Sequence, residues 1–546
     1  MQQKIILKVL PQEATSNDSI KNYIAKEVGK KTEEITGYYL LKKSIDARSK
    51  TVWVNLTVNA FINEPFQQRD LQLFDFKDVS NSPKKSIIIG GGPAGIFAAL
   101  QLLESGIKPI ILERGKEVRE RRRDLALLNR EGIINAESNY CFGEGGAGTY
   151  SDGKLYTRSS KRGNIDRILH LFVHFGADES VLYDAHPHIG TNKLPHIITA
   201  MRKRIIDCGG EFHFNKKVTD FIIEKDEIKS VKTADGDLIS ADSFILATGH
   251  SARDIFALLH QKNIEIIAKG FALGVRIEHP QELINHIQYG KSNLANTSLL
   301  MEANGLPPAS YSLVEQVDGR GVFSFCMCPG GIIAPAATSE NELVVNGWSP
   351  SKRNNPYANS GLVVQVEMED VLKYISSDKR SRELYDTASP LIMMDFQREV
   401  EQKAFAAGGG KFVAPAQRLI DFTKDRISAT LPKCSYIPGI TSSSLKEVLP
   451  GFIHHRLQKG FRAFAKKMPG KNGHSGYFTN EAVLVATESR TSSPVRIPRD
   501  EKLLHHPQIK NLFPCGEGAG YAGGIVSAAM DGERVALACV SAHTFS

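Results

Sequence analysis

The chain has 546 residues, of which 41% are apolar and 23% charged, and its formal net charge is +8. These proportions are those of an ordinary soluble protein, and the length predicts two to four domains. No apolar run approaches the roughly 20 residues that span a bilayer, which excludes a membrane-spanning helix. The positive charge is mild for this length, so it permits anionic cofactors, substrates or RNA and requires none of them.

The amino terminus has a short apolar run without a small-residue cleavage site, so it predicts a strand rather than a signal peptide. The seven cysteines are an odd and sparse set that does not resemble a disulfide framework. Both features favour a cytoplasmic location.

The first 80 residues predict a small α+β domain. KIILKVL is typical of a strand and SIKNYIAKEVGK of an amphipathic helix, while TVWVNLTV alternates apolar and polar residues as a half-buried strand does. The turn-rich stretch DVSNSPKK then predicts a linker. Nothing in this segment indicates its function.

From Ser86 the pattern changes to a βαβ unit. SIIIG predicts a strand, GIFAALQLLESG a helix and KPIILERG a second strand. Gly90, Gly92 and Gly95 between the first strand and the helix form a G-x-G-x-x-G spacing. In such a motif the first glycine permits the turn, the second lets the backbone approach a pyrophosphate, and the third lets the helix pack on the strand. This context predicts a dinucleotide site.

Glu113 ends the second strand, 18 residues after Gly95, where an acid takes the ribose hydroxyls of a dinucleotide. Arg114 and the basic residues that follow it can accept a 2′-phosphate. Because Glu113 would repel such a phosphate, we favour an unphosphorylated ribose. The run Arg121–Arg123 is interpreted as a solvated helix face.

A second G-x-G-x-x-G spacing occurs near the end of the chain, at Gly518, Gly520 and Gly523. An independent second site would need another acid-ended strand after its helix, and the chain stops before one. We therefore predict that this segment closes over the dinucleotide held by the first motif, with Glu517 bonding a ribityl or ribose hydroxyl.

Together these pieces resemble the glutathione-reductase type of FAD-binding fold. Three separated pieces build such a fold, and this chain has a counterpart of each. They are GGGPAG with ILERG, a strand that ends in ILATGH (245–250), and the carboxy-terminal stretch FPCGEGAGYAGGI. Most such flavoproteins carry Asp where this chain has Glu517. Further stretches are similar to the uncharacterised FAD-dependent dehydrogenases of bacteria, distant relatives of geranylgeranyl and fumarate reductase flavoproteins: FGEGGAGTYSDGKLYTR (142–158), GHSARD (249–254), GVRIEHPQ (274–281), FCMCPGG (325–331) and ESRTSSPVRI (488–497).

The resemblance implies an α/β fold with a Rossmann-like FAD-binding domain that is split in sequence. We expect the amino-terminal domain at 1–80, the first FAD-binding part at 84–265, an inserted β-rich substrate or cap domain at 266–479, and the carboxy-terminal FAD-binding part at 480–546. The expected FAD contacts are Gly90, Gly92, Pro93, Ala94, Gly95, Glu113, Arg114, Gly145, Gly146, Thr149, Ser151, Ala247, Thr248, Gly249, Gly516, Glu517, Gly523, Gly524 and Ile525.

The catalytic groups are less defined by the sequence, and the candidates are Arg490, Arg496, His250, Glu488 and Cys328. An arginine near the flavin can stabilise negative charge or hold a substrate carboxylate by a bidentate contact, or it can belong to an Arg–Glu network that joins domains. Cys326 and Cys328 form a C-x-C pair, either two structural thiols or a redox-active cysteine beside the flavin. No metal site is predicted, because the spacing of cysteines and histidines supplies no ligand set.

The expected function is FAD-dependent oxidation or reduction of an organic substrate, with hydride transfer at flavin N5. NAD(P)H is a candidate transient electron donor, although no separate NAD(P) domain is visible. Two alternatives stay open. A flavin-dependent RNA-modifying enzyme would use the positive charge for phosphate binding, although the basic residues are scattered, and a non-catalytic FAD-binding regulatory protein would dock partners through its first domain.

Overall fold

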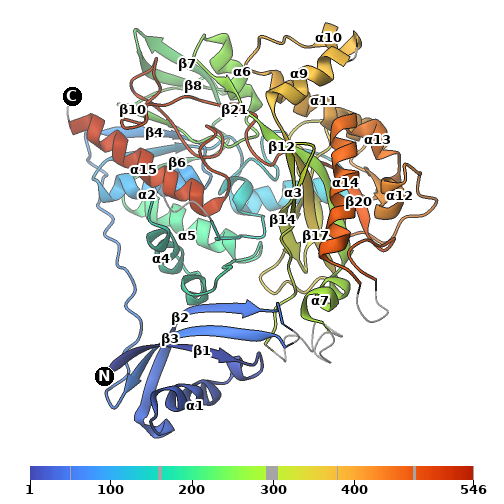
Figure 1. The fold of residues 1–546 in the computed structure, drawn as a ribbon. Helices are drawn as coiled ribbons and strands as arrows, with labels where there is room; N and C mark the ends of the chain where they lie inside the picture. The colour runs from blue at the N-terminus through green and yellow to red at the C-terminus, as the bar shows by residue number, and fades with distance from the viewer. Residues whose placement is uncertain (50, 158–162, 291–304, 378, 471–474, 545–546) are drawn as a thin grey trace.

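A computed structural model describes residues 1–49, 51–157, 163–290, 305–377, 379–470 and 475–544. The amino-terminal segment folds as an antiparallel sheet of order β1-β3-β2, formed by β1 (Gln2–Val9), β2 (Ile35–Asp46) and β3 (Trp53–Ile62). The predicted alternation is confirmed, because Val54, Leu56 and Val58 of β3 are buried against Ile20 and Ile24 of helix α1 (Asn17–Val28). This unit lies at one end of the molecule, at the bottom of the view (Figure 1).

The predicted βαβ unit is confirmed as β4 (Lys85–Ile89), α2 (Pro93–Glu104) and β5 (Lys108–Leu112). It lies in a parallel five-stranded sheet of order β22-β10-β4-β5-β6, completed by β6 (Glu211–His213), β10 (Ser243–Leu246) and β22 (Leu512–Pro514). Strand β4 pairs with β5 on one side and β10 on the other. At such a change of strand order, ligands bind beyond the carboxyl ends of the strands.

Helices cover both faces of this sheet. Helix α15 (Ile525–Thr544) lies beside α2, although more than 400 residues separate them in sequence (Figure 1). The same apolar core includes α4 (Ile165–His174) and α5 (Leu194–Asp207). The opposite core includes α6 (Arg253–Gln261) and the small sheet of β7 (Val218–Glu224), β8 (Glu227–Thr233) and β9 (Leu238–Ser240). Helix α3 (Val118–Glu131) follows β5.

The remaining residues build around a seven-stranded sheet of order β13-β14-β17-β12-β20-β18-β19. Its strands are β12 (Phe271–Pro280), β13 (Val314–Val317), β14 (Arg320–Pro329), β17 (Tyr357–Val366), β18 (Ala414–Arg418), β19 (Ile440–Ser442) and β20 (Val483–Glu488). Two small pairs accompany it: β11 (Ile267–Ala268) with β21 (Val495–Arg496), and β15 (Ile332–Pro335) with β16 (Val345–Trp348). The helices are α7 (Gln281–Tyr289), α9 (Met368–Ser377), α10 (Lys379–Leu384), α11 (Ile392–Ala407), α12 (Leu419–Thr423), α13 (Leu445–Val448) and α14 (Gly451–Lys467).

This arrangement confirms the predicted fold class, a Rossmann-like parallel sheet joined to a β-rich unit. Strand β20 falls in the segment 480–546 that we expected to be part of the FAD-binding domain, yet it pairs with β12 and β18 of the seven-stranded sheet. We therefore propose that the boundary of the β-rich domain lies after Glu488. Among the described residues, the search for a helix with the length and hydropathy of a membrane span finds none.

Candidate functional site

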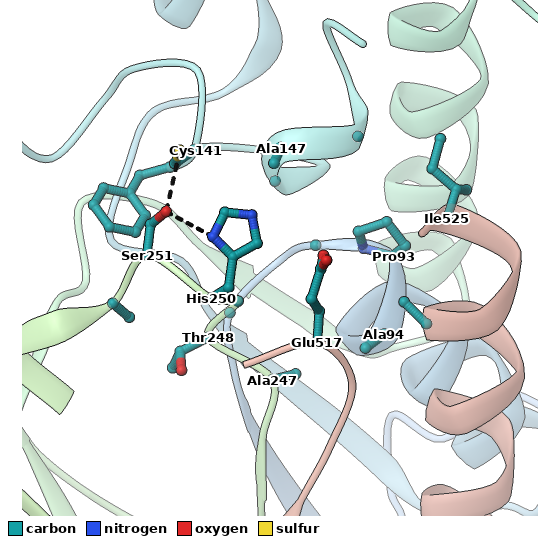
Figure 2. A pocket seen from close by; sticks show the side chains of 18 of the residues that line it. Pro93, Ala94, Cys141, Ala147, Ala247, Thr248, His250, Ser251, Glu517 and Ile525 are labelled. Atoms are coloured by element: carbon teal, nitrogen blue, oxygen red, sulfur yellow. Dashed lines mark hydrogen bonds between the residues drawn. The ribbon is translucent and has the colours of Figure 1, made fainter. Parts of the chain in front are cut away.

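A cavity of about 350 Å³ opens where the carboxyl ends of β4, β10 and β22 meet the β-rich unit. A volume of this size lies within the range of small-molecule sites. Its wall combines residues from the three separated sheet segments with residues such as Phe325, Cys326 and Asn346 from the β-rich unit. Figure 2 shows Pro93 and Ala94, Ala247 to Ser251, and Glu517 with Ile525 facing this space from three different parts of the chain.

The first glycine motif gives the cavity a backbone wall. Gly90 has a φ of +108°, and a Cβ there would lie 2.5 Å from the Ala247 carbonyl oxygen, so β4 and β10 approach as only glycine allows. Gly92 is the N-cap of α2 and has no side chain to cap the first-turn N–H groups. Gly95, within α2, faces the end of β4 instead of the cavity, since its Cβ would lie 2.1 Å from the Gly90 oxygen. The helix therefore presents uncapped N–H groups to the cavity, where a phosphate is stabilised.

Glu113 lines the cavity, and most of the acceptor positions of its carboxylate are already filled by backbone N–H groups. Oε1 accepts hydrogen bonds from the backbone N–H groups of Gly115 and Gly143, both at 2.9 Å, and Oε2 accepts one from Gly91 at 2.8 Å. A carboxylate has about four acceptor positions. One position therefore remains on Oε2, enough for a single ribose hydroxyl.

Within the glycine-rich loop, Gly146, Ala147, Gly148 and Ser151 line the cavity. Two other residues of the loop, which we expected to contact FAD, hold it together from behind. Thr149 is buried and donates from Oγ1 to the Glu144 carbonyl at 2.7 Å, and a Cβ on Gly145 would lie 2.0 Å from that same Oγ1. Gly145 and Thr149 thus shape the loop, and its backbone forms the wall.

Glu517 is a largely enclosed acceptor that extends toward the cavity beside Pro93 (Figure 2). Gly516 before it is anchored by its N–H to Asp531 Oδ2 at 2.8 Å. No described residue donates a hydrogen bond to the Glu517 carboxylate in this structure. Burial raises its pKa to about 7, and the positive charge of Lys269 opposes that shift. An enclosed carboxylate without a donor fits a ligand that brings hydroxyl groups.

His250 follows β10 and also faces the cavity (Figure 2). Its Nδ1 lies 2.9 Å from Ser251 Oγ, and that hydroxyl donates to Cys141 Sγ at 3.4 Å. Burial, and after it the positive charges of Arg490 and Arg253, lower the His250 pKa to about 4. The ring is therefore neutral at physiological pH, and because Ser251 donates to Cys141, Nδ1 carries the proton that Ser251 accepts and Nε2 is left as an acceptor.

Arg490 borders the cavity, but most of its N–H groups already donate hydrogen bonds to other residues of the chain. Its guanidinium donates to Glu401 at 3.1 and 2.9 Å, to Glu342 at 2.9 Å and to Thr338 at 2.6 Å. These bonds use four of the five N–H groups of an arginine. With Arg253, which pairs with the same two glutamates, it forms a buried network. The geometry favours the domain-joining alternative over a bidentate substrate clamp.

The remaining catalytic candidates do not line the cavity. Glu488 is buried and pairs with Arg276 at 2.7 Å, and burial raises its pKa to about 7. Arg496 is exposed on β21, with its guanidinium 5.5 Å from the Tyr521 ring centre. Cys328 is fully buried, and its neighbour Cys326 reaches the cavity in its place. No group of three or more metal-ligating side chains occurs within the described ranges.

Two family matches cover separate parts of the chain. Residues 270–491 match the family described as FAD-dependent protein, C-terminal domain-like, and residues 1–61 match a domain of unknown function. A protein of Clostridium beijerinckii, described as an uncharacterized protein, is 38% identical over 535 residues and covers 95% of each chain. The chain belongs to this family of FAD-dependent proteins.

Solved structures are similar to this flavoprotein at low identity. A geranylgeranyl bacteriochlorophyll reductase-like protein of Thermoplasma acidophilum is 12% identical with a TM-score of 0.34, covering 85% of this chain and 79% of that one. The open conformation of a flavocytochrome c3 fumarate reductase is 11% identical with a TM-score of 0.31, covering 85% and 80%. Glycine oxidase of Bacillus cereus is 12% identical with a TM-score of 0.29, covering 84% and 95%.

The flavoprotein's cavity also contains side chains absent from the sequence-based list. Lys154, Lys216 and Lys217 contribute cations, and Phe325 and Asn346 enter from the β-rich unit. Lys154 follows the glycine-rich loop in sequence, so its position could have indicated that it lies near the cavity. The lysine pair after β6 belongs to no motif, and only the folded sheet brings it to the cavity. Of the expected FAD contacts, Gly95, Gly145, Thr149 and Gly516 support the wall from behind.

Proposed function

We propose that this protein is an FAD-dependent oxidoreductase that binds FAD in the cavity at the ends of β4, β10 and β22. One observation carries the proposal: three segments far apart in sequence converge on one cavity, and the first and last of them contribute groups suited to different parts of the cofactor. When bound, FAD supplies hydride chemistry toward an organic substrate.

The chain's own residues divide the binding task. The first turn of α2, from Pro93, would receive the diphosphate, and Gly92 with Gly146 would let it approach the backbone. Glu113 would take one ribose hydroxyl through its remaining acceptor position. Glu517 would accept hydroxyl groups of the ribityl chain or ribose.

The substrate would enter from the side formed by the β-rich unit. Phe325 and Asn346 from this unit border the same cavity as His250, so they can orient a molecule there and exclude water from it. Since Nδ1 of neutral His250 is bonded to Ser251, its Nε2 would accept a hydrogen bond from a polar group of the substrate. We also infer a reducing compartment, because all seven cysteines are free thiols.

The first experiment tests the cofactor. The purified protein should be yellow and release FAD on denaturation, identified by mass spectrometry, and the stripped protein should rebind FAD with one-to-one stoichiometry. A colourless protein that takes up no FAD would overturn the proposal.

A second experiment tests turnover and its electron source. The FAD-loaded protein is mixed anaerobically with NADH or NADPH while the flavin absorbance is followed. Bleaching by one of them identifies a nicotinamide as the donor, and no bleaching by either removes direct nicotinamide coupling. Bound RNA in the purified protein would instead support the RNA-modifying alternative.

A further inference from the structure

Two thiols lie together at the wall of the cavity. Cys326 and Cys328 are two residues apart on β14, and their Sγ atoms are 4.0 Å apart. The pairing of β14 with β17 shifts register between Phe325 and Cys328, and Cys326 has a φ of +46°. A left-handed backbone at a residue other than glycine is strained, and such strain gathers at functional sites. Cys326 lines the cavity, whereas Cys328 is fully buried behind it.

Two cations face these thiols from separate elements, Lys154 half-buried and Arg276 fully buried. Lys154 Nζ lies 3.8 Å from Cys326 Sγ and 3.7 Å from Cys328 Sγ. Arg276 on β12 donates from Nη2 to the Cys326 carbonyl at 2.8 Å and lies 3.7 Å from Cys328 Sγ. A cation within this range favours the thiolate form of a cysteine, which is the nucleophilic form.

Acidic side chains compensate the same cations from the other side. Asp152 lies 3.3 Å from Lys154 Nζ and also accepts from Arg353 at 2.8 Å, while Glu488 pairs with Arg276 at 2.7 Å. The net effect still favours one thiolate. The pKa of Cys326 is held well below its ordinary value, first by its hydrogen bond from Cys328 and then by Lys154 and Arg276, against burial and Asp152.

The second thiol is held in its protonated form. The single S–H of Cys328 lies within reach of Cys326 Sγ at 4.0 Å and of the Cys326 carbonyl at 3.2 Å, and the pKa of Cys328 is raised well above its ordinary value by the bond with Cys326 and by burial. The two cysteines therefore differ in access and in charge, as the attacking and resolving thiols of a redox pair do.

We propose that Cys326 and Cys328 form a redox-active dithiol that reduces a low-molecular-weight disulfide entering the cavity. The Cys326 thiolate attacks one sulfur of R–S–S–R, forming a mixed disulfide and releasing R–S⁻. Cys328 then loses its proton and attacks Cys326 Sγ, releasing the second R–S⁻. Two thiolates leave and take up two protons at neutral pH, the substrate disulfide is reduced by two electrons, and the protein dithiol is oxidised to a disulfide.

The geometry requires only a short closure. The two sulfurs must approach from 4.0 Å to a bond length of about 2.05 Å, which turning of the cysteine side chains at the register shift can supply. This inference goes beyond the proposed function, and its chemistry takes place between two cysteines of the chain and the substrate disulfide, without a step on the cofactor. Its failure would leave FAD binding unaffected, and FAD content is measured on the same samples.

The first test follows the sulfur atoms by mass spectrometry. FAD-loaded protein is treated with oxidised glutathione, and intact mass and peptide maps are recorded. The wild type should lose two hydrogens within the peptide that contains both cysteines. Cys328→Ser should stop at a mixed disulfide with one glutathione on Cys326, and Cys326→Ser should form neither product. Cys208→Ser, which removes a thiol that does not line the cavity, should behave as the wild type.

The second test asks whether Lys154 favours the thiolate form of Cys326. The rate of alkylation by iodoacetamide is measured as a function of pH. At pH 6.5 Cys326 should react roughly fivefold faster than an ordinary thiol, since a larger thiolate fraction outweighs the lower nucleophilicity. Lys154→Met should move the profile of Cys326 to higher pH, and Lys154→Arg should restore it. An unchanged wild-type mass with oxidised glutathione, preferential modification of Cys141, or a Cys326 profile insensitive to Lys154→Met would each overturn the proposal.

Discussion

Gly92 and Gly146 face each other so closely that a Cβ on Gly146 would lie 3.1 Å from the Gly92 Cα. The two glycines belong to different segments, one at the start of α2 and one in the glycine-rich loop. Their approach leaves a narrow backbone wall beside the first turn of the helix. A diphosphate bound at that turn would therefore meet backbone, without any side chain in between.

Replacing Gly92 with valine should remove FAD binding without unfolding the protein. A Cβ at Gly92 would lie 3.8 Å from its nearest neighbour, the Cα of Gly146, and the φ of −80° there suits any residue, so the free energy of unfolding of the apoprotein should change by less than about 1 kcal/mol. The side chain would fill the diphosphate position, and FAD affinity should fall roughly 100-fold, or about 2.7 kcal/mol, by calorimetric titration.

Gly95→Ala provides the contrast for that variant. Its Cβ would lie 2.1 Å from the Gly90 oxygen, so this change should lower thermal stability of the apoprotein, where Gly92→Val does not. Normal FAD affinity in Gly92→Val would show that the diphosphate lies elsewhere.

FAD affinity should depend on pH through Glu517. Its pKa of about 7 in the free protein means that the carboxyl is protonated below that pH. Hydroxyl donors of the ligand favour the ionised form, so binding must displace a proton at low pH. Affinity should therefore rise by up to about tenfold per pH unit from pH 5 to 7 and level off above. In Glu517→Gln this dependence should disappear, and a slope that persists in this variant would assign it to another group.

Arg490 should matter more for stability than for FAD affinity. Arg490→Leu leaves Glu401 and Glu342 to share Arg253 in a buried site, which should lower the free energy of unfolding by about 3–5 kcal/mol in urea denaturation. Arg398 also approaches Glu342, at 3.7 Å, but its side chain is 38% exposed, so Arg398→Leu should change stability by less than about 1 kcal/mol. Equal effects of the two substitutions would contradict the network.

Substitution by glycine and by alanine should affect protein stability in opposite order at Cys326 and at Cys328. At Cys326, where φ is +46°, glycine relieves a left-handed strain that alanine keeps, so Cys326→Gly should be more stable than Cys326→Ala by about 1 kcal/mol. At Cys328, which has no such φ, Cys328→Gly should be less stable than Cys328→Ala by about 0.5–1 kcal/mol. Thermal denaturation of the four variants measures both differences, and the same ranking at both positions would contradict the strain.

Much of the cofactor side of the fold could be predicted from the sequence. Local patterns define β4, α2 and β5, because apolar runs, glycine spacing and the acid that follows all act over short distances. The pairing of β20 could not be predicted from the sequence, since its strand pattern does not indicate which of the two sheets it joins. The sequence indicated Glu113 and Arg490 as candidate site residues. It could not show how many hydrogen bonds each already makes within the protein, because their partners are distant in sequence.

The sequence by itself determined that the chain carries a strand–glycine–helix motif with an acid-ended second strand and returns to strand and glycine near its end. These features depend on backbone conformation, which neighbouring residues largely set. Only the tertiary structure decided that Lys154, Arg276 and the two cysteines of β14 meet at one wall of the cavity. Their charges interact through space, and the distances between them are fixed by the strand order β14-β17-β12 of the seven-stranded sheet and by the loop that carries Lys154, which no spacing along the chain encodes.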